Sequence, residues 1–276
     1  MEVRGSVALV TGAAAGAGRA IARRLGADGA LVVVADVDLR AGQETAQSIE
    51  AQGSSARFVQ TDVTSSDDVR RMVAFAEREL GRPQILINNA GGGGHVEPHF
   101  PDADPDRWQA ILDLNLGSAM LATQLALGPM HLAGGGVIVN IASTAGLGFG
   151  PYVSPEYGAA KAGLIRFTSS LAGLRERMNV RINCVVPDWI ATERAREELA
   201  RMMPAQRAAT PAPIPPEEIA DAVVEFAGDE DLAGRIMVMW PGEPARLLDP
   251  ALRLWRSCFD GTGHTRPRFR SHFAAI

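Results

Sequence analysis

The chain has 276 residues, and its 27 Lys and Arg against 32 Asp and Glu leave a formal net charge of −5. That length suffices for one sizeable α/β domain, and the balanced charge gives no electrostatic reason to expect a nucleic-acid partner. No charged-then-apolar leader precedes the first strand pattern, and the longest apolar run, residues 30–35, is too short to span a membrane. Two cysteines make no disulfide framework. We therefore expect a cytoplasmic protein without a membrane segment.

Short runs rich in Val, Ile, Leu and Ala alternate along the chain with longer segments of helical period. The predicted strands cover residues 7–10, 31–35, 56–60, 85–88, 137–141, 181–186 and 235–239. The predicted helices between them cover residues 18–27, 39–51, 67–80, 105–132, 155–178 and 216–227. Near-continuous apolar strands are typical of parallel strands buried on both faces. The alternation predicts an α/β fold, a doubly wound parallel sheet of the Rossmann type, with ligands beyond the strand C-termini.

The chain is expected to form one catalytic domain over residues 1–242. Within it, residues 189–216 are predicted to form a substrate lid, a short charged helix followed by a loop rich in Pro and Ala. Residues 243–276 form an Arg-rich C-terminal extension. This extension is either a partly ordered tail or an arm that packs on a neighbouring subunit.

A glycine-rich turn follows the first predicted strand and opens the first helix, with Gly12, Gly16 and Gly18. Glycine allows a tight turn and close approach of a pyrophosphate, whose charge a helix N-terminus favours. Asp36 ends the second strand, 20 residues after Gly16, where a carboxylate binds ribose hydroxyls and repels a 2′-phosphate. Arg40 is near enough to hold that phosphate, but no basic residue occupies the turn itself. The sequence favours NAD over NADP.

Asp62 and Val63 follow the third predicted strand. An acid at this place is commonly a turn or helix-capping residue. It could equally accept a hydrogen bond from the adenine amino group of the cofactor. Spacing alone leaves both interpretations open.

Tyr157 and Lys161 stand four residues apart on one predicted helix face, and Ser143 lies upstream of them. A free tyrosine titrates near pH ~10, and an ammonium one helical turn away favours the phenolate. The other tyrosine of the chain has no lysine one turn later. Together with a dinucleotide-binding turn, this pair predicts hydride transfer between a nicotinamide and an alcohol or ketone, with Tyr157 as general acid/base.

These features, taken in order, resemble the short-chain dehydrogenase/reductase family over residues 3 to about 241. The motifs are Thr11-Gly12-x-x-x-Gly16-x-Gly18, Asp62-Val63, Asn88-Asn89-Ala90-Gly91, Asn115, Ser143, Tyr157-x-x-x-Lys161, and Pro187 with Thr192. The resemblance implies a seven-stranded Rossmann sheet and a homotetramer or homodimer. It also implies NAD or, less readily, NADP as cofactor and a small-molecule alcohol or ketone as substrate.

The resemblance further implies roles for individual residues. Ser143 would orient the substrate oxygen, and Lys161 would lower the pKa of Tyr157 and hold the nicotinamide ribose. Asn115 would hold a water that relays protons, although it could also be a buried amide without chemistry. The implied cofactor contacts are Gly12, Ala15, Gly16, Ala17, Asp36, Asp62, Val63, Asn89, Ala90, Gly91, Tyr157, Lys161, Pro187, Ile190 and Thr192. The histidines lack metal-ligand spacing, so we expect no metal.

The sequence departs from the family pattern at Asp188, where the family usually has glycine after a proline. We hypothesise that this carboxylate lies near the nicotinamide and favours its positively charged, oxidised form. The interval from Ser143 to Tyr157 is one residue longer than the common spacing. The usual terminal Asp-Gly-Gly is also missing, so subunit contacts there are expected to differ.

The expected pocket wall comes from residues 92–95, residues 149–153, Trp189 and the lid helix over residues 193–203. Its mostly apolar or aromatic side chains favour a hydrophobic or ring-containing substrate. A second hypothesis is that the protein binds NAD without turnover, as a regulatory or structural subunit. A third is a methyltransferase, which also has a Gly-rich turn but leaves the pairing of Tyr157 with Lys161 unexplained.

Overall fold

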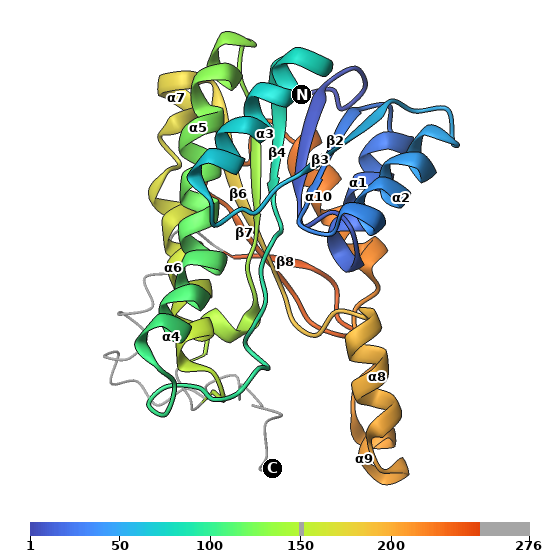
Figure 1. Cartoon of the computed structure of the whole chain (residues 1–276), viewed down its shortest axis with the longest axis vertical. Helices are drawn as coiled ribbons and strands as arrows, with labels where there is room; N and C mark the ends of the chain where they lie inside the picture. Colours follow the sequence, from blue (N-terminus) through green and yellow to red (C-terminus); the bar gives the residue numbers. More distant parts are fainter. Residues whose placement is uncertain (149–151, 249–276) are drawn as a thin grey trace, which may run out of the picture.

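The computed structural model describes residues 1–148 and 152–248. Within them, eight strands form one sheet in the order β3-β2-β1-β4-β5-β6-β7-β8. Figure 1 shows this sheet between its helices. The strands are β1 (Val7–Thr11), β2 (Leu31–Asp36), β3 (Ala56–Gln60), β4 (Pro83–Asn88), β5 (Gly136–Ile141), β6 (Val180–Pro187), β7 (Ile236–Met239) and β8 (Arg246–Leu247). The pairs from β3 through β7 are all parallel. The predicted doubly wound parallel sheet is confirmed.

Strand β8 is an addition to the seven strands that the resemblance implied, and it runs antiparallel to β7. A tight turn reverses the chain after β7, with Gly242 at φ 72° and Glu243 N donating to the Trp240 carbonyl at 3.1 Å. Leu248 N then donates to the Ile236 carbonyl at 2.8 Å. The first residues of the expected extension therefore cover the edge of the sheet. Its remainder, residues 249–276, lies outside the described residues.

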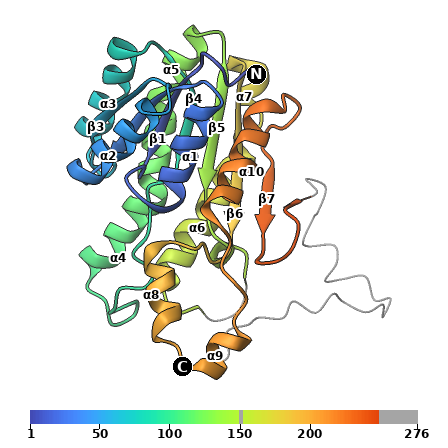
Figure 2. The same ribbon diagram turned by 90° about the vertical axis from the view of Figure 1, so that its right-hand side faces the viewer.

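Helices cover both faces of the sheet (Figures 1 and 2). One face carries α1 (Gly16–Ala27), α2 (Leu39–Glu50) and α10 (Pro216–Gly228), and the other carries α3 (Ser66–Glu79), α5 (Ser118–Leu132) and α6 (Pro155–Ser170). Side chains of β1 alternate between the two cores, Ala8 and Val10 in one and Val7 and Leu9 in the other. Burial on both faces explains why the strands are apolar throughout.

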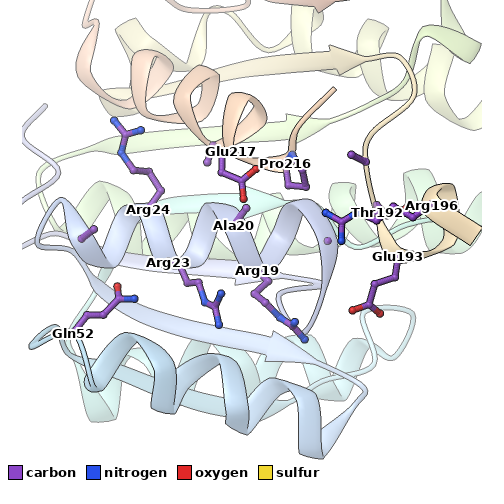
Figure 3. Close-up of a pocket in the computed structure, with 14 residues that line it drawn as sticks. Arg19, Ala20, Arg23, Arg24, Gln52, Thr192, Glu193, Arg196, Pro216 and Glu217 are labelled. Carbon is purple, nitrogen blue, oxygen red and sulfur yellow. The ribbon is translucent and has the colours of Figure 1, made fainter. Parts of the chain in front are cut away.

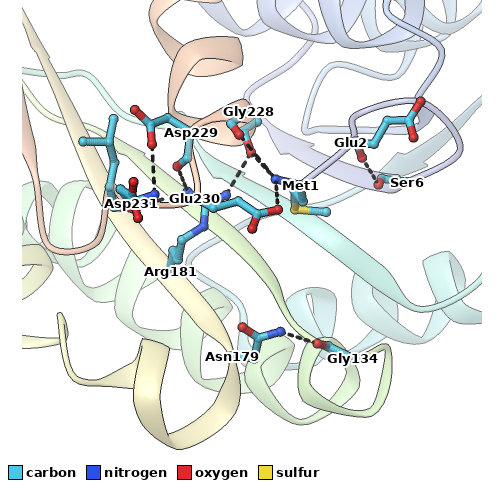
Figure 4. Close-up of polar contacts among 12 residues, drawn as sticks. Met1, Glu2, Ser6, Gly134, Asn179, Arg181, Gly228, Asp229, Glu230 and Asp231 are labelled. Carbon is cyan, nitrogen blue, oxygen red and sulfur yellow. Dashed lines mark hydrogen bonds and ion pairs between the residues drawn. The ribbon is translucent and has the colours of Figure 1, made fainter.

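The end of the sheet where β6 begins is held by charged groups (Figure 4). Arg181 is buried, and its guanidinium donates to the carbonyls of Phe226 and Ala227 at 2.7 and 2.8 Å. These carbonyls belong to the last turn of α10, where a cation satisfies unpaired acceptors and the helix dipole. The N-terminal amine of Met1 pairs with Glu230 at 3.0 Å nearby. These contacts lie at the sheet end opposite the strand C-termini.

The predicted helix over residues 105–132 is helical throughout but not uniform. It consists of α4 (Pro105–Leu112), a π-helical turn η1 (Asp113–Gly117) and α5. By length and composition, with an 18-residue window of mean hydropathy 1.3, Pro105–Leu132 is the one described helix that could cross a membrane. Its inner side packs against β4 and β5, so we interpret it as a core helix.

Two other predicted segments differ in detail. The predicted helix over residues 155–178 is interrupted around Gly173 and resumes as α7 (Leu174–Met178). The predicted lid loop contains a short helix, α9 (Pro204–Ala209), because Pro204 suits a first helical turn. The lid begins with α8 (Glu193–Arg201), and both lid helices extend beyond the strand C-termini (Figures 1 and 2).

Candidate active site

Two glycines at the junction of β1 and α1 leave no room for a larger side chain. A Cβ added at Gly18 would lie 2.1 Å from the Gly12 carbonyl oxygen, and one at Gly12 would lie 2.8 Å from Ala90 Cα. Gly12 and Gly16 also have left-handed backbone angles, with φ of 63° and 52°. Ala15 precedes α1 without a side-chain cap, so no side chain satisfies the first amides of this helix there. This cradle fits the pyrophosphate of a dinucleotide.

Asn89 and Ala90, which directly follow the neighbouring strand β4, hold this turn in place. Asn89 Nδ2 donates to the carbonyls of Thr11 and Gly12, each at 3.0 Å. The backbone amides of Asn89 and Ala90 both donate to Thr11 Oγ1 at 3.1 Å. The side chain of Asn89 therefore has a structural task that spacing did not indicate, and its predicted cofactor contact stays a prediction.

Asp36 is fixed by the backbone at the end of β2. Its Oδ2 accepts from Ala14 N at 2.8 Å, and its Oδ1 accepts from Asp38 N at 3.0 Å. Arg40, the alternative phosphate ligand, is exposed and pairs with Glu44 at 2.8 Å on α2. The carboxylate is thus held rigidly beside the glycine turn, while the guanidinium has a partner elsewhere.

Asp62 makes the local contacts expected of an acid in a turn before a helix. Its Oδ1 accepts from the amide and the hydroxyl of Thr64, at 2.9 and 2.6 Å, just before α3. The following Val63 is buried. These contacts do not test the predicted adenine bond, which stays a prediction.

The base of the lid rests on the glycine turn. Thr192 caps α8, its hydroxyl accepting from Ala195 N at 3.2 Å, and a Cβ at Gly16 would lie 3.2 Å from its methyl carbon. Ile190 and Ile214 form an isolated bridge that joins the two ends of the lid. Pro187, the last residue of β6, leads into this segment. Three of the predicted cofactor positions thus lie along one short stretch of chain.

Ser143, Tyr157 and Lys161 come together beyond the C-terminal end of β5. Lys161 is buried on α6, and its Nζ donates to the Ile141 carbonyl at 3.0 Å. The same Nζ lies 5.6 Å from the centre of the Tyr157 ring. The Ser143 side chain acts on the Tyr157 hydroxyl and lowers its pKa, which opposes the effect of burial. The helical spacing and the strand end therefore bring the predicted trio into one site.

The pKa values of Tyr157 and Lys161 are shifted in opposite directions. Burial raises the pKa of Tyr157 to about 12, and Tyr152 adds to the rise, whereas Ser143 and the charge of Arg194 oppose it. Burial also lowers the pKa of Lys161 to about 8. Burial thus dominates the pKa of both groups in the chain by itself. The predicted effect of Lys161 on the phenol beside a bound nicotinamide stays a prediction.

Asn115 lies in the π-helical turn and is buried. Its Nδ2 donates to the carbonyls of Gly92 and Ile111, at 2.8 and 2.9 Å, and its Oδ1 accepts from Gly92 N at 2.9 Å. A Cβ at Gly91 would lie 2.8 Å from Asn115 Oδ1 and 3.1 Å from Lys161 Nζ. The side chain thus holds the loop after β4 against Lys161. Its predicted water relay stays a prediction.

Two contacts beside Tyr157 were not predicted. Tyr152 stacks on Tyr157, with ring centres 6.4 Å apart and planes inclined by 26°. The carboxylate of the neighbouring Glu156 is hydrogen-bonded to His99 Nδ1 at 2.9 Å, and both side chains are largely buried. The histidine belongs to the loop between β4 and α4, so the pair ties that loop to α6. No spacing rule links residues 57 positions apart.

A cavity of about 490 Å³ lies on the outer side of α1, between α8 and α10. Figure 3 shows Arg19, Arg23 and Arg196 at its wall. It includes Gly16 and Thr192 of the predicted cofactor residues but none of the catalytic trio. We therefore assign it to the surface beside the phosphate turn rather than to substrate.

The predicted pocket wall is described in part, because residues 149–151 lie outside the described residues. Gly94 packs on the Tyr157 ring, where an added Cβ would lie 2.7 Å from Cγ. Trp189 is partly buried at the base of the lid. Among residues 1–148 and 152–248, no group of three His, Cys, Asp or Glu side chains could hold a metal ion.

Comparison with known proteins agrees with this geometry. The profile of the family described as short chain dehydrogenase matches residues 6–202. The chain is 37% identical over 232 residues to cis-4-hydroxycyclohexanecarboxylate dehydrogenase of Sinomonas cyclohexanicum, covering 81% of this chain and 89% of that protein. It is 32% identical over 230 residues to 7alpha-hydroxysteroid dehydrogenase of Bacteroides fragilis, covering 82% of this chain and 88% of that protein.

Solved structures show the same fold. A 7 alpha-hydroxysteroid dehydrogenase complexed with NADH and 7-oxo glycochenodeoxycholic acid superposes with a TM-score of 0.79 at 29% identity. The match covers 87% of this chain and 95% of that one. The chain belongs to the short-chain dehydrogenase family, whose named relatives here are oxidoreductases.

Proposed function

We propose that the protein is an NAD-dependent dehydrogenase that interconverts a secondary alcohol and its ketone, with Tyr157 as general acid/base. The observation that carries the proposal is the convergence of Ser143, Tyr157 and Lys161 at the end of β5, beside the loop that follows β4. Parallel α/β sheets bind ligands at this end. The family membership supports an oxidoreductase activity.

In alcohol oxidation, the substrate O–H proton goes to the Tyr157 oxygen while the carbon-bound hydrogen leaves with its electron pair. Bound NAD would take up that hydride and bring a positively charged ring to the site. Ser143, whose side chain lowers the pKa of Tyr157, would hold the substrate oxygen at the phenol. A positioned acid/base contributes about 10²- to 10⁴-fold to the rate. In the reverse direction Tyr157 returns the proton to the ketone oxygen.

The preference for NAD rests on Asp36. Its carboxylate is held by Ala14 N and Asp38 N next to the phosphate turn, where it can accept from both ribose hydroxyls. A 2′-phosphate would meet this negative charge. The nearby Arg40 already pairs with Glu44.

We further propose a ring-borne secondary alcohol as substrate. The paired rings of Tyr152 and Tyr157 and the partly buried Trp189 provide flat apolar surface near the phenol. The relatives named above act, by their names, on a hydroxycyclohexane carboxylate and a hydroxysteroid. Both carry the hydroxyl on a saturated ring.

Assembly as a homotetramer or homodimer also belongs to this proposal. Met120 and Leu132 on α5 are apolar and expose 45% and 66% of their surface, which a second copy would cover. Sedimentation of the purified protein tests this point, and a monomer at working concentration would contradict it.

The test of function is a screen of cyclohexanols and hydroxysteroids with NAD and with NADP, followed at the nicotinamide absorbance. Tyr157→Phe should lower kcat by at least about 100-fold, whereas Tyr152→Phe, which keeps the stacked ring, should have a much smaller effect. If NADH binds tightly but no substrate turns over, the protein binds the cofactor without catalysis. Equal activity of wild type and Tyr157→Phe would refute the assigned role.

A further inference from the structure

Asp188 differs from the usual family residue, and the structure gives its carboxylate a specific partner. Thr144 Oγ1 donates to Asp188 Oδ1 at 2.7 Å, and both residues are partly buried. Asp188 N donates to the Met239 carbonyl at 2.9 Å, so the backbone is anchored on β7. Among the described residues, Asn179 is the one non-glycine residue with positive φ, so Asp188 carries no left-handed strain. The distinctive feature of this position is therefore the carboxylate.

Thr144 directly follows Ser143 and begins the short 3-10 turn η2 (Thr144–Gly146). This turn has little freedom on its other side, because a Cβ at Gly146 would lie 2.5 Å from Ala162 N of α6. Ser143 Oγ also accepts from Ala145 N at 3.2 Å. The turn is thus held between α6 on one side and Asp188 on the other.

We propose that the pair formed by Thr144 and Asp188 is a positioning device that sets the Ser143 hydroxyl against Tyr157. The inference rests on the proposed function for its kinetic consequence, but its structural claim concerns the chain alone. A hydroxyl bound to a carboxylate makes a short, directional hydrogen bond, stronger than one between neutral groups. Its loss would let the turn shift and would move the Ser143 hydroxyl relative to the phenol.

The groups that face Tyr157 define the expected effect on its ionisation. Ser143 and Arg194 favour the phenolate, and Tyr152 and burial oppose it. Lys161 Nζ, 5.6 Å from the ring centre, also faces the phenol. The Asp188 carboxylate acts on Tyr152. Loosening Ser143 removes one favourable contact, so the phenol becomes harder to ionise and the acid limb of alcohol oxidation moves to higher pH.

The experiment compares Thr144→Val, which keeps the shape without the hydroxyl, with Thr144→Ser, which keeps the hydroxyl. Thr144→Val and Asp188→Asn should each lower kcat about tenfold with less than about threefold change in KM, and Thr144→Ser should restore most of the rate. The double variant Thr144→Val/Asp188→Asn should be no slower than the slower single variant, because both changes break one contact. Ser65→Ala serves as control, since it removes a remote hydroxyl–carboxylate pair on α3.

A second readout needs no turnover. The chain has two tyrosines, so protein labelled with [¹³C]tyrosine gives two ring signals, and Tyr152→Phe identifies that of Tyr157. Thr144→Val should shift the Tyr157 signal, while Thr144→Ser and Ser65→Ala should leave it in place. If the wild-type protein shows no turnover, the proposed function is overturned, but the spectrum still tests the positioning role of Thr144 and Asp188. The positioning role would be overturned if the Tyr157 signal did not move in Thr144→Val. It would also be overturned if the losses of kcat in the two single variants were additive in a folded double variant.

Discussion

Lys161 should lower the stability of the fold that carries it. Burial lowers its pKa from 10.5 to about 8, and its Nζ has the Ile141 carbonyl as its protein acceptor at 3.0 Å. One pKa unit corresponds to about 1.4 kcal/mol, so keeping this side chain protonated near pH 7 costs about 3 kcal/mol. Lys161→Met removes that cost but leaves the Ile141 carbonyl without its donor, a loss of about 1 kcal/mol. We expect the variant to be inactive and more stable by about 2 kcal/mol.

The pH dependence of this difference is fixed by the direction of the shift. Between the folded pKa of about 8 and the unfolded value near ~10.4, the unfolded chain binds more protons than the folded one. Wild-type stability therefore rises with pH in this window, while Lys161→Met lacks this contribution. The extra stability of Lys161→Met over wild type should be fully present below pH ~8 and lost by pH ~10.5.

Urea unfolding of both proteins at pH values from ~7 to ~10 measures the difference directly. Lys161 is the sole lysine of the chain, so a protein labelled with [¹³C]lysine gives one lysine signal, whose midpoint reports this pKa alone. A midpoint near the ordinary ~10.4, or a variant less stable than wild type at pH ~7, would refute the reasoning from burial.

Two further predictions concern carboxylates beside the site. Asp36→Ala should lower kcat/KM with NAD about tenfold and reduce the ratio of kcat/KM with NAD to that with NADP. Asp36→Asn keeps an acceptor for Asp38 N, so it separates the effect of charge from that of turn geometry. If this ratio is unchanged in Asp36→Ala, another residue sets the cofactor preference. Burial opposes the charge of Glu156, but hydrogen bonds from its own amide and from His99 outweigh it and lower its pKa. A lowered carboxyl pKa stabilises the fold above the unfolded value near ~4.3, and this contribution is lost as pH falls through the folded value. Glu156→Gln should therefore unfold about 1 kcal/mol more easily at neutral pH and match wild type in acid.

The fold was predictable because its signals are local. The predicted strand over residues 56–60 matches β3 residue for residue, and the glycine turn lies where the first strand pattern ends. The features that were missed lie where a chain reversal or a helix end is not marked by the apolar pattern. Strand β8 forms because the turn at Gly242 returns the chain along β7, an edge that no local pattern reveals. The interruption of the helix after Ser170 is another such feature.

The sequence predicted that Ser143, Tyr157 and Lys161 come together, but it did not predict their pKa shifts. The spacing of Tyr157 and Lys161 places both on one side of α6, as expected. Their pKa values follow from burial, which spacing does not report. The partner of Asp188 lies 44 residues away in sequence, so the hypothesis that its carboxylate faces the nicotinamide could not weigh Thr144 as a competitor. That hypothesis stays a prediction.

The opposing shifts at Tyr157 and Lys161 lead to a final expectation about cofactor binding. With pKa values of about 12 and about 8, the chain alone disfavours both the phenolate and the ammonium that alcohol oxidation requires. A positive charge beside the phenol favours the phenolate, and the oxidised nicotinamide carries one that the reduced ring lacks. NAD⁺ should therefore shift the ring signal of Tyr157 in [¹³C]tyrosine-labelled protein toward the ionised form near pH ~8, and NADH should not. Equal shifts with both forms would mean that ring charge is not what makes the phenol acidic.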